Sequence, residues 1–255
     1  MSLDQELIGS EFVDKTILWD GGNDRPDYVR KQKKKLGKDW YYYDKDIEYK
    51  YNTNGFRCPE FNTLDWANSI VIFGCSDACG VGNTVEDTVA GKLESLLGIP
   101  VINLGISGTS IDHACYNSLC LNEHYPNPKA VVHIWSGLGR YAEFNPEGKD
   151  PNEHYYPVFG KRWQVVNIRP TGVRYCNKHN WEIRNMFYIK ADRQIWRNKT
   201  IYYETTFFEK TAKELDIDWL ERIDYARDFD HPGYQSNQLM AELIAKNLKE
   251  KGLTL

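Results

Sequence analysis

The sequence of 255 residues predicts an α/β protein, a three-layer α/β/α domain built on a parallel sheet. Short apolar runs rich in β-branched residues alternate along the chain with longer segments in which apolar residues recur every three or four positions. The hydrophobic fraction of 41% and the aromatic fraction of 14% are sufficient for a sizeable core. The net charge of −4 provides no argument for nucleic acid or a membrane surface as a partner.

The strands are expected where the apolar runs are short and end at a glycine or a polar turn. They are residues 69–73, 101–104, 130–135, 200–203 and 219–223. The helices are expected where the apolar period is close to 3.6 residues, at residues 84–97, 110–124, 181–197, 206–215 and 232–251. Gly98 ends the first of these helices, and Pro232 suits the first turn of the last one. Strands and helices that alternate at this spacing are joined by right-handed crossovers, so the sheet is parallel.

One segment outside this alternation comes first in the chain. Residues 1–68 are polar and rich in turns, and we expect an N-terminal extension packed on the domain of residues 69–255. The basic run at 31–35 is typical of a solvated helix face or loop. Alternating aromatic and charged residues at 40–51 predict a hairpin or two short edge strands.

The second such segment is an insert after the third strand, at about residues 137–198, where the regular pattern lapses. Residues 137–200 contain 12 Lys/Arg and 6 Asp/Glu, whereas the whole chain is acidic. Large aromatic residues are interspersed with them: Tyr155, Tyr156, Trp163, Trp181 and Trp196. This composition fits a lid that stacks on sugar rings and attracts anions, and it fits equally a surface insert with a small core of its own.

The cysteines are expected to be reduced thiols, because a chain of this length does not need a disulfide framework and its first residues are acidic, unlike an export signal. They are Cys58, Cys75, Cys79, Cys115, Cys120 and Cys176. No apolar run approaches the roughly 18 residues of a membrane span, so we expect a cytoplasmic protein. Cys115, Cys120, His113 and His124 lie close together in the sequence but lack the Cys-x-x-Cys spacing of structural zinc, and we expect no metal.

Polar residues follow the expected strands at the edge where an open parallel sheet binds its ligands. Ser76 lies in a glycine-rich turn after the first strand, and Asp228 and His231 come just before the last helix. A serine hydroxyl is not ionised at neutral pH and needs a base, an anion that holds the base, and oxyanion donors. We therefore expect Ser76 to be the nucleophile, His231 the base and Asp228 its partner. The backbone N–H groups of Ser76 and Gly105 are expected to bind the oxyanion.

These residues resemble the sequence blocks of the SGNH/GDSL hydrolases. Residues 74–76, Gly-Cys-Ser, resemble the first block, Gly-Asp-Ser, and residues 103–105, Asn-Leu-Gly, match the second, Asn-x-Gly. Residues 228–231, Asp-Phe-Asp-His, match the last block, Asp-x-x-His. The resemblance covers roughly residues 69–136 and 199–250. It implies the flavodoxin-like SGNH hydrolase fold, and hydrolysis of an ester-linked acyl group by a Ser-His-Asp triad with no metal or cofactor.

One block departs from the pattern of this family. The third block, Gly-x-Asn-Asp, should end the third strand, but residues 135–138 read Trp-Ser-Gly-Leu and contain no asparagine. The family uses that asparagine as an oxyanion donor, and the loss of one such donor typically costs about 3 kcal/mol or more. We expect the side chain of Ser136 or Arg140 to take its place.

Three residues near these blocks have competing interpretations. Asp230 is an alternative to Asp228 as the carboxylate, although its position next to the histidine is the poorer spacing. Cys75 precedes the serine, but strand alternation turns it to the other face of the sheet, which favours a packed structural thiol. His133 lies inside an apolar strand and is expected to be a core histidine.

The expected function is that of a serine esterase that acts on a small-molecule or glycan ester. The aromatic insert favours an acylated carbohydrate among these substrates. An acyltransferase that uses the same triad and a catalytically weak glycan-binding protein are the alternatives. Neither nucleic acid nor a membrane is expected as a partner.

Overall fold

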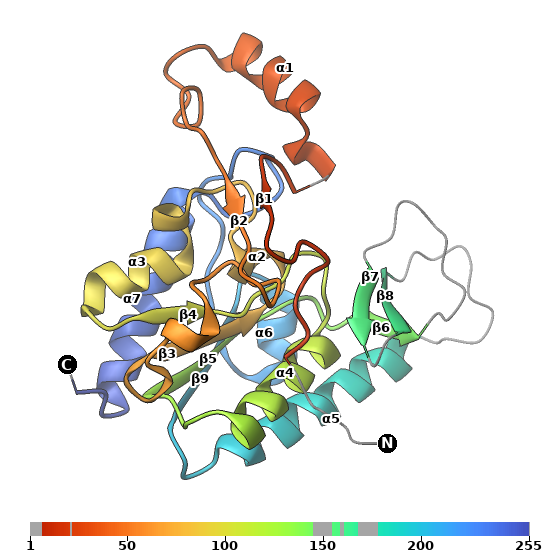
Figure 1. The fold of residues 1–255 in the computed structure, drawn as a ribbon, viewed down its shortest axis with the longest axis vertical. Coiled ribbons are helices and arrows are strands. Elements are labelled where there is room, and N and C mark those ends of the chain that lie inside the picture. The colour runs from red at the N-terminus through yellow and green to blue at the C-terminus, as the bar shows by residue number, and fades with distance from the viewer. Residues whose placement is uncertain (1–6, 21, 145–154, 159–160, 168–177, 255) are drawn as a thin grey trace.

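The structure is a computed structural model that describes residues 7–20, 22–144, 155–158, 161–167 and 178–254. Its centre is a five-stranded parallel sheet (Figure 1). The strands are β3 (Ile70–Gly74), β4 (Val101–Asn103), β5 (Ala130–Trp135), β9 (Ile201–Thr206) and β10 (Asp218–Trp219). Their order across the sheet is β10-β9-β5-β3-β4, and all neighbouring pairs are parallel. This is the flavodoxin-like order, so the predicted fold class is confirmed.

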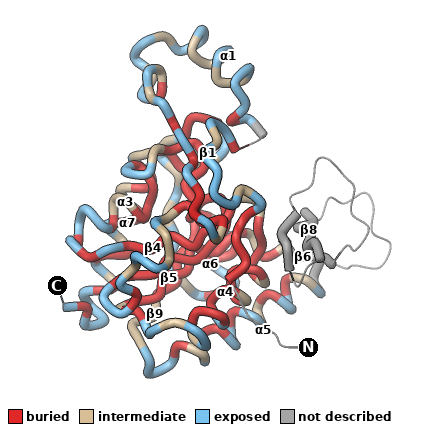
Figure 2. Tube along the Cα trace, in the orientation of Figure 1, coloured by how far each residue is buried: buried red, intermediate tan, exposed pale blue. Residues whose placement is uncertain are grey.

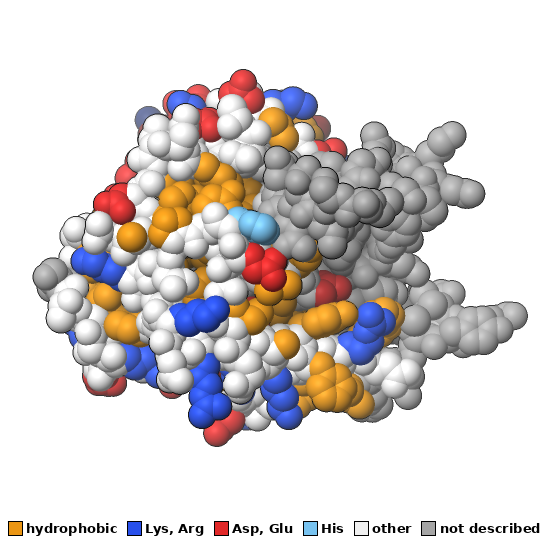
Figure 3. Space-filling model, turned by 60° about the horizontal axis from the view of Figure 1, so that its bottom comes forward, with side chains coloured by type: hydrophobic (Ala, Val, Ile, Leu, Met, Phe, Trp, Pro, Cys, Tyr) orange, Lys and Arg blue, Asp and Glu red, His pale blue; other side chains and the backbone are white. Residues whose placement is uncertain are grey.

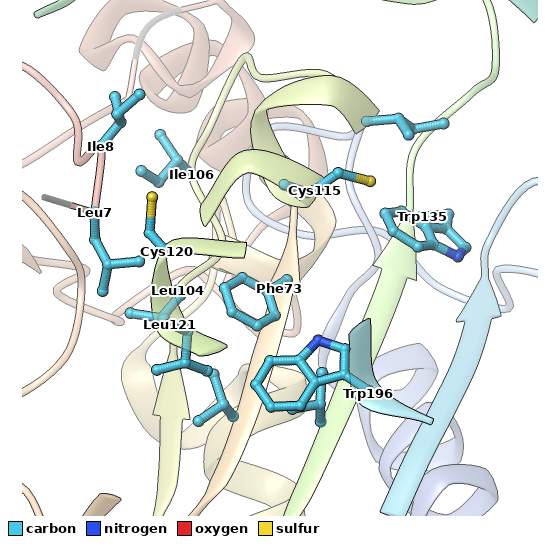
Figure 4. Close-up of a cluster of buried hydrophobic side chains, with 14 of the residues drawn as sticks. Leu7, Ile8, Phe73, Leu104, Ile106, Cys115, Cys120, Leu121, Trp135 and Trp196 are labelled. Carbon is cyan, nitrogen blue, oxygen red and sulfur yellow. The ribbon is translucent and has the colours of Figure 1, made fainter. Parts of the chain in front are cut away.

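Helices cover both faces of the sheet, which is why its strands are apolar on both sides. The helices are α3 (Val89–Leu97), α4 (Ile111–His124), α5 (Lys178–Trp196) and α7 (Tyr234–Glu250). α4 and α5 pack on the face that receives Val71 and Phe73 of β3, whereas α3 and α7 pack on the face that receives Ile70 and Ile72. Figure 4 shows the hydrophobic core on the side of α4 and α5, where Phe73 lies among apolar side chains from the sheet and from the helices.

The helix expected at 84–97 is divided in the structure. A 3₁₀ turn, η4 (Val85–Asp87), comes first, and α3 then begins after Thr88. The Oγ1 of Thr88 accepts the N–H of Gly91 at 3.1 Å, and this N-cap starts a new helix within the predicted one. The shorter helix α6 (Glu209–Leu215) precedes β10 close to its predicted position.

Two further helix boundaries differ from the sequence prediction. A one-turn helix, α2 (Ser76–Cys79), directly follows β3, where the pattern indicated only a loop, because four residues are too few to show a helical period. The last helix, α7, begins at Tyr234 rather than at Pro232, which instead forms an isolated β-bridge with Tyr225.

The N-terminal residues contain little regular structure. Their elements are β1 (Thr16–Ile17), η1 (Gly22–Asp24), α1 (Pro26–Leu36), β2 (Tyr49–Lys50), η2 (Phe61–Thr63) and η3 (Trp66–Asn68). The basic run at 31–35 lies on α1, which has no buried residue and stands at the exposed end of the molecule (Figure 2). Of the hairpin or two short edge strands predicted at 40–51, the structure contains one short strand, β2, which pairs antiparallel with β1.

The segment after β5 forms a small antiparallel sheet of its own. Its strands are β6 (Arg140–Phe144), β7 (Tyr155–Val158) and β8 (Lys161–Asn167), in the order β6-β8-β7. The side chains of Tyr155, Tyr156 and Trp163 lie outside the described residues. α5 then returns to the core, where Trp196 is fully buried and donates to the Ser118 Oγ at 2.7 Å. Trp196 is therefore a core residue, and it has no free ring face for a sugar.

On the face seen in Figure 3, Lys and Arg side chains are scattered among uncharged and apolar ones. Within the described ranges, no helix combines the length and the apolar character that crossing a bilayer requires.

Candidate active site

The strand order contains a reversal of winding at β3. From β3 the chain moves to β4 on one side and then returns to β5 on the other, so the direction of winding reverses at β3. Ligands of open α/β sheets bind at such a reversal, beyond the carboxyl ends of the strands. Ser76 follows β3 and Ser136 follows β5, so both serines lie at this position.

The turn that carries Ser76 is tightly packed. Gly74 has a φ of +154°, and a Cβ at this position would lie 2.5 Å from the carbonyl oxygen of Ile134 and 2.8 Å from the Cβ of Ala78. Only glycine fits here, and it allows the chain to turn directly from β3 into α2. Ser76 is the first residue of α2, and only 5% of its surface is exposed. Its backbone N–H, in the first turn of a helix, has no intrahelical acceptor.

Asp228 and His231 form a hydrogen-bonded pair. The Nδ1 of His231 lies 2.5 Å from the Oδ2 of Asp228, and the Oδ1 of Asp228 accepts the backbone N–H groups of Asp230 at 3.1 Å and His231 at 3.2 Å. Burial alone would lower the pKa of His231, but the hydrogen bond and charge of Asp228 outweigh it and raise the pKa. Burial likewise opposes the ionised form of Asp228, but contact with His231 lowers its pKa. The pair therefore favours the charged imidazolium, and among the described residues its Nε2 has no hydrogen-bond partner.

The loop that carries this pair is fixed at both of its ends. Asp224 caps α7, since its two carboxylate oxygens accept the N–H groups of Ser236 at 2.8 Å and Gln235 at 3.0 Å. The N–H of Ala226 donates to the carbonyl of His231 at 2.9 Å and closes the loop. Sequence reasoning missed Asp224, because it caps the helix from outside the usual N-cap position.

The loop after α2 packs directly against Asp228. Gly82 has a φ of +75°, and a Cβ there would lie 2.7 Å from the Ala226 Cβ and 3.2 Å from the Asp228 Oδ1. The backbone N–H of Arg227 also donates to the Gly82 carbonyl at 3.1 Å. The segment that begins with Ser76 and the loop that carries the base are therefore in contact.

Arg57, from the N-terminal residues, holds the same segment in place. Its Nη1 donates to the carbonyls of Cys79 at 3.2 Å and Gly80 at 2.9 Å, and its Nη2 donates to the carbonyl of Asn83 at 2.7 Å. Its contribution could not be predicted, because no local pattern links residue 57 to these carbonyls.

The hydroxyl of Ser76 makes no hydrogen bond to the imidazole among the interactions of the described residues. Among the described residues, its Oγ makes one contact of hydrogen-bond type, with the Sγ of Cys75 at 3.9 Å, and none with His231. The charge of Asp77, next to the serine, nevertheless helps to raise the pKa of His231, after the larger effect of Asp228. The structure therefore contains the hydrogen bond between the histidine and the aspartate of the expected triad, but not the one between the serine and the histidine.

Gly105 has a different role from the one expected. Its backbone N–H donates to the Oδ1 of Asn103 at 2.9 Å and so is already occupied. A Cβ on Gly105 would lie 2.6 Å from the backbone nitrogen of Cys79 and 2.7 Å from the Ala78 Cβ. The glycine allows the loop after β4 to pack closely on α2, and the predicted oxyanion donor has an internal acceptor instead.

Ser136 and Arg140 remain as candidate oxyanion donors. Ser136 is 2% exposed, and its buried Oγ has no hydrogen-bond partner among the described residues. Burial raises the pKa of Cys75, and the positive charge of Arg140 counteracts that rise. The Asn185 side chain donates to the Leu138 carbonyl at 2.6 Å and to the Arg140 carbonyl at 2.8 Å, which fixes the loop between them.

The three residues with competing interpretations are Asp230, Cys75 and His133. Asp230 is exposed, and the imidazole Nδ1 is taken by Asp228. Cys75 is buried, and burial raises the pKa of its thiol, which keeps it protonated. His133 is fully buried with its Nε2 2.9 Å from Asp192, in agreement with a core histidine. No group of three or more possible ligands is arranged for a metal in the part of the chain that is described.

The fold and the site together define an α/β protein with a buried serine and a histidine–aspartate pair at the carboxyl edge of its parallel sheet. A scan against protein-family models and a search of curated proteins each find no match. Among solved structures, the fold is similar to those of SGNH/GDSL-type lipolytic proteins and carbohydrate acetylesterases.

Three solved structures illustrate this similarity. A carbohydrate acetylesterase family member from Sinorhizobium meliloti is 12% identical, with 71% of this chain and 98% of that chain covered and a TM-score of 0.42. A GDSL-like lipase from Bacteroides uniformis is 12% identical, with 72% and 96% covered and a TM-score of 0.43. An acetyl xylan esterase from Butyrivibrio proteoclasticus is 10% identical, with 74% and 65% covered and a TM-score of 0.44.

Proposed function

We propose that this protein is a serine esterase in which Ser76 is the nucleophile, His231 the general base and Asp228 the residue that orients the base. The observation that carries this proposal is the 2.5 Å contact between the His231 Nδ1 and the Asp228 Oδ2, in a loop packed on the segment that begins with Ser76. A carboxylate on Nδ1 selects the tautomer whose Nε2 can accept a proton.

The reaction proceeds by acyl transfer to the serine. The Ser76 hydroxyl turns from Cys75 toward His231 and attacks the ester carbonyl, while the His231 Nε2 accepts its proton. The imidazolium, stabilised by Asp228, then donates this proton to the departing alcohol. Water, deprotonated by the same Nε2, releases the acyl group and regenerates the serine.

The developing oxyanion needs donors close to Ser76. Its own backbone N–H, in the first turn of α2, is one of them. The unpartnered hydroxyl of Ser136 is the second, and the nearby charge of Arg140 adds to the stabilisation. Among possible substrates we favour an acylated carbohydrate, because the segment after β5 combines a net positive charge with several large aromatic residues.

The experiment that tests this function is covalent labelling with a fluorophosphonate, followed by mass mapping of the labelled peptide. The label should be found on Ser76 and should be absent from Ser76→Ala, whereas Cys75→Ala, which changes the adjacent buried thiol, should still react. Hydrolysis of p-nitrophenyl acetate by the same three proteins should follow the same pattern. A label on another residue, or undiminished turnover by folded Ser76→Ala, would exclude the proposal. Acyl transfer to an added sugar in preference to water would identify an acyltransferase.

A further inference from the structure

Arg222 links the two halves of the candidate site. It lies in the loop between β10 and α7, where its Nη1 donates to the backbone carbonyl of Asp230 at 2.7 Å. Its Nη2 donates to the Oδ2 of Asp77 at 3.3 Å. Asp77 directly follows the candidate nucleophile and Asp230 directly precedes the candidate base. One guanidinium therefore bridges the short helix α2 and the loop that carries Asp228 and His231.

The bridge is shielded from solvent. The side chain of Asp77 is 2% exposed and that of Arg222 is 21% exposed. The guanidinium carbon lies 5.9 Å from the ring centre of Phe207 and 5.2 Å from that of Phe208, within the range of cation–π contact. Enclosed charges of this kind are screened less than exposed ones, so each acts strongly on its neighbours.

Besides Asp228, the carboxylate that orients it, two further negative charges act on His231. Asp228 contacts it directly, while Asp77 from α2 and Asp230 from its own loop add to the negative potential, and all three raise its pKa. Arg222 is the cation between the last two of these residues. Without it, the imidazole would stay protonated to a higher pH, and a protonated imidazole cannot accept the proton of a serine.

We propose that Arg222 is a positioning residue that neutralises Asp77 and holds the backbone of Asp230, so that His231 remains available as a base near neutral pH. This inference rests on the proposed function. It predicts effects of opposite sign for the two members of the bridge, because Arg222 opposes the protonated imidazole and Asp77 favours it. A purely structural role would move both variants in the same direction, through lost stability.

The test is a charge cycle of Arg222→Gln, Asp77→Asn and the double variant, with kcat/KM for p-nitrophenyl acetate measured against pH. Arg222→Gln should raise the midpoint of the acidic limb by about 0.5–1 pH unit. Asp77→Asn should lower the midpoint, and the double variant should lie near the wild type. Arg222→Lys, which retains the charge, should keep the midpoint close to the wild-type value. An unchanged midpoint in Arg222→Gln, or shifts in the same direction in both single variants, would overturn the inference.

A second measurement separates this inference from the proposed function. The imidazole of His231 can be titrated by NMR in Ser76→Ala proteins, where no turnover is needed, and the signal is assigned by its loss in His231→Ala. The same opposite shifts are expected there. If they occur while Ser76→Ala retains turnover, the bridge acts as inferred but the esterase assignment fails. If Ser76→Ala is inactive and the titration of His231 does not respond to Arg222→Gln, only the role of Arg222 is excluded. If Arg222→Gln does not fold, the direction in which Asp77→Asn shifts the pH midpoint decides the test.

Discussion

Arg227 forms a two-pronged ion pair with Asp24, in which its Nε lies 2.6 Å from Oδ1 and its Nη2 lies 2.9 Å from Oδ2. Arg227 immediately precedes Asp228 of the candidate site. The hydroxyl of Tyr49 donates to the same Asp24 carboxylate at 2.6 Å and accepts the N–H of Gly82 at 2.7 Å. One buried carboxylate from the N-terminal residues therefore fixes both the loop of the base and the loop that follows the nucleophile.

Replacing Asp24 by alanine should destabilise the protein by about 3–5 kcal/mol, because it leaves a buried arginine without its partner. The side chains of Asp24 and Arg227 are 0% and 9% exposed. Asp27→Ala is the matched control, since Asp27 pairs with Arg30 on the surface of α1, where the two side chains are 79% and 69% exposed. Urea denaturation should show little change for this control. Equal losses in both variants would contradict the role assigned to Asp24.

Asp228→Asn should reduce kcat by about 10⁴-fold, because an asparagine selects the wrong imidazole tautomer. His231→Ala should lose at least as much. Asp230→Asn is the control, since its carboxylate does not contact the imidazole, and it should retain most of the wild-type kcat. The measurement is the steady-state hydrolysis of an activated ester. A large loss in Asp230→Asn together with a mild effect of Asp228→Asn would exchange the roles of the two residues.

The activity should depend on pH through the protonation of His231. Its pKa is raised above the ordinary value of 6.5, chiefly by Asp228 acting against burial, and only the neutral form is a base. Measured from about pH 5 to about pH 9, kcat/KM should therefore rise to a plateau with a midpoint above 6.5. The same raised pKa means that protonated His231 stabilises the fold below the ordinary histidine pKa, as long as Asp228 is ionised, and that this contribution is lost as the pH rises through the folded-state pKa of His231. An acidic limb centred below 6.5 would contradict this assignment.

Gly82→Ala should impair activity, because the new Cβ would displace the loop of Asp228 in addition to the strain of a positive φ. We expect at least about a tenfold loss of kcat from such a displacement. Gly98→Ala separates the two effects, since Gly98 has a φ of +64° but nothing within 4 Å of its Cβ position. This control should lose about 1 kcal/mol of stability and none of its kcat.

Ser136→Ala should lower kcat by about 100- to 1000-fold with little change in KM, if its unpartnered hydroxyl binds the oxyanion only in the transition state. Arg140→Met tests the other candidate. If Ser136→Ala leaves kcat unchanged and Arg140→Met lowers it strongly, the oxyanion donor is the arginine. KM effects without kcat effects would indicate binding of the ground state instead.

The parallel sheet could be predicted from the sequence because its strands β3, β4 and β5 are short, mostly apolar runs that are buried along their whole length. The pairing of β1 with β2 could not, because their register, Ile17 opposite Tyr49, brings together residues far apart in the chain. The antiparallel sheet after β5 was also missed, since its strands lack the regular alternation that marks one buried face.

The candidate site was predicted as far as local sequence blocks reach. Ser76, Asp228 and His231 lie in such blocks, and the close contact of Asp228 with His231 follows from their spacing. Two ion pairs join distant segments, and a local sequence pattern cannot predict them. They are those of Arg222 with Asp77 and of Arg227 with Asp24. The hydrogen bond of the Gly105 N–H, by contrast, is local, because its acceptor is the Asn103 side chain of the same block.

The order in which these residues are synthesised has a consequence for the growing chain. Ser76 follows the first parallel strand, whereas His231 follows the last one, and Asp24 has no arginine partner until Arg227, 203 residues later, has been synthesised. Contacts between such distant segments form late, because large loops must close before they can be made. On the ribosome, Ser76 is therefore synthesised long before its proposed base, and the arrangement proposed for attack on an ester can form only after Asp228 and His231 have emerged.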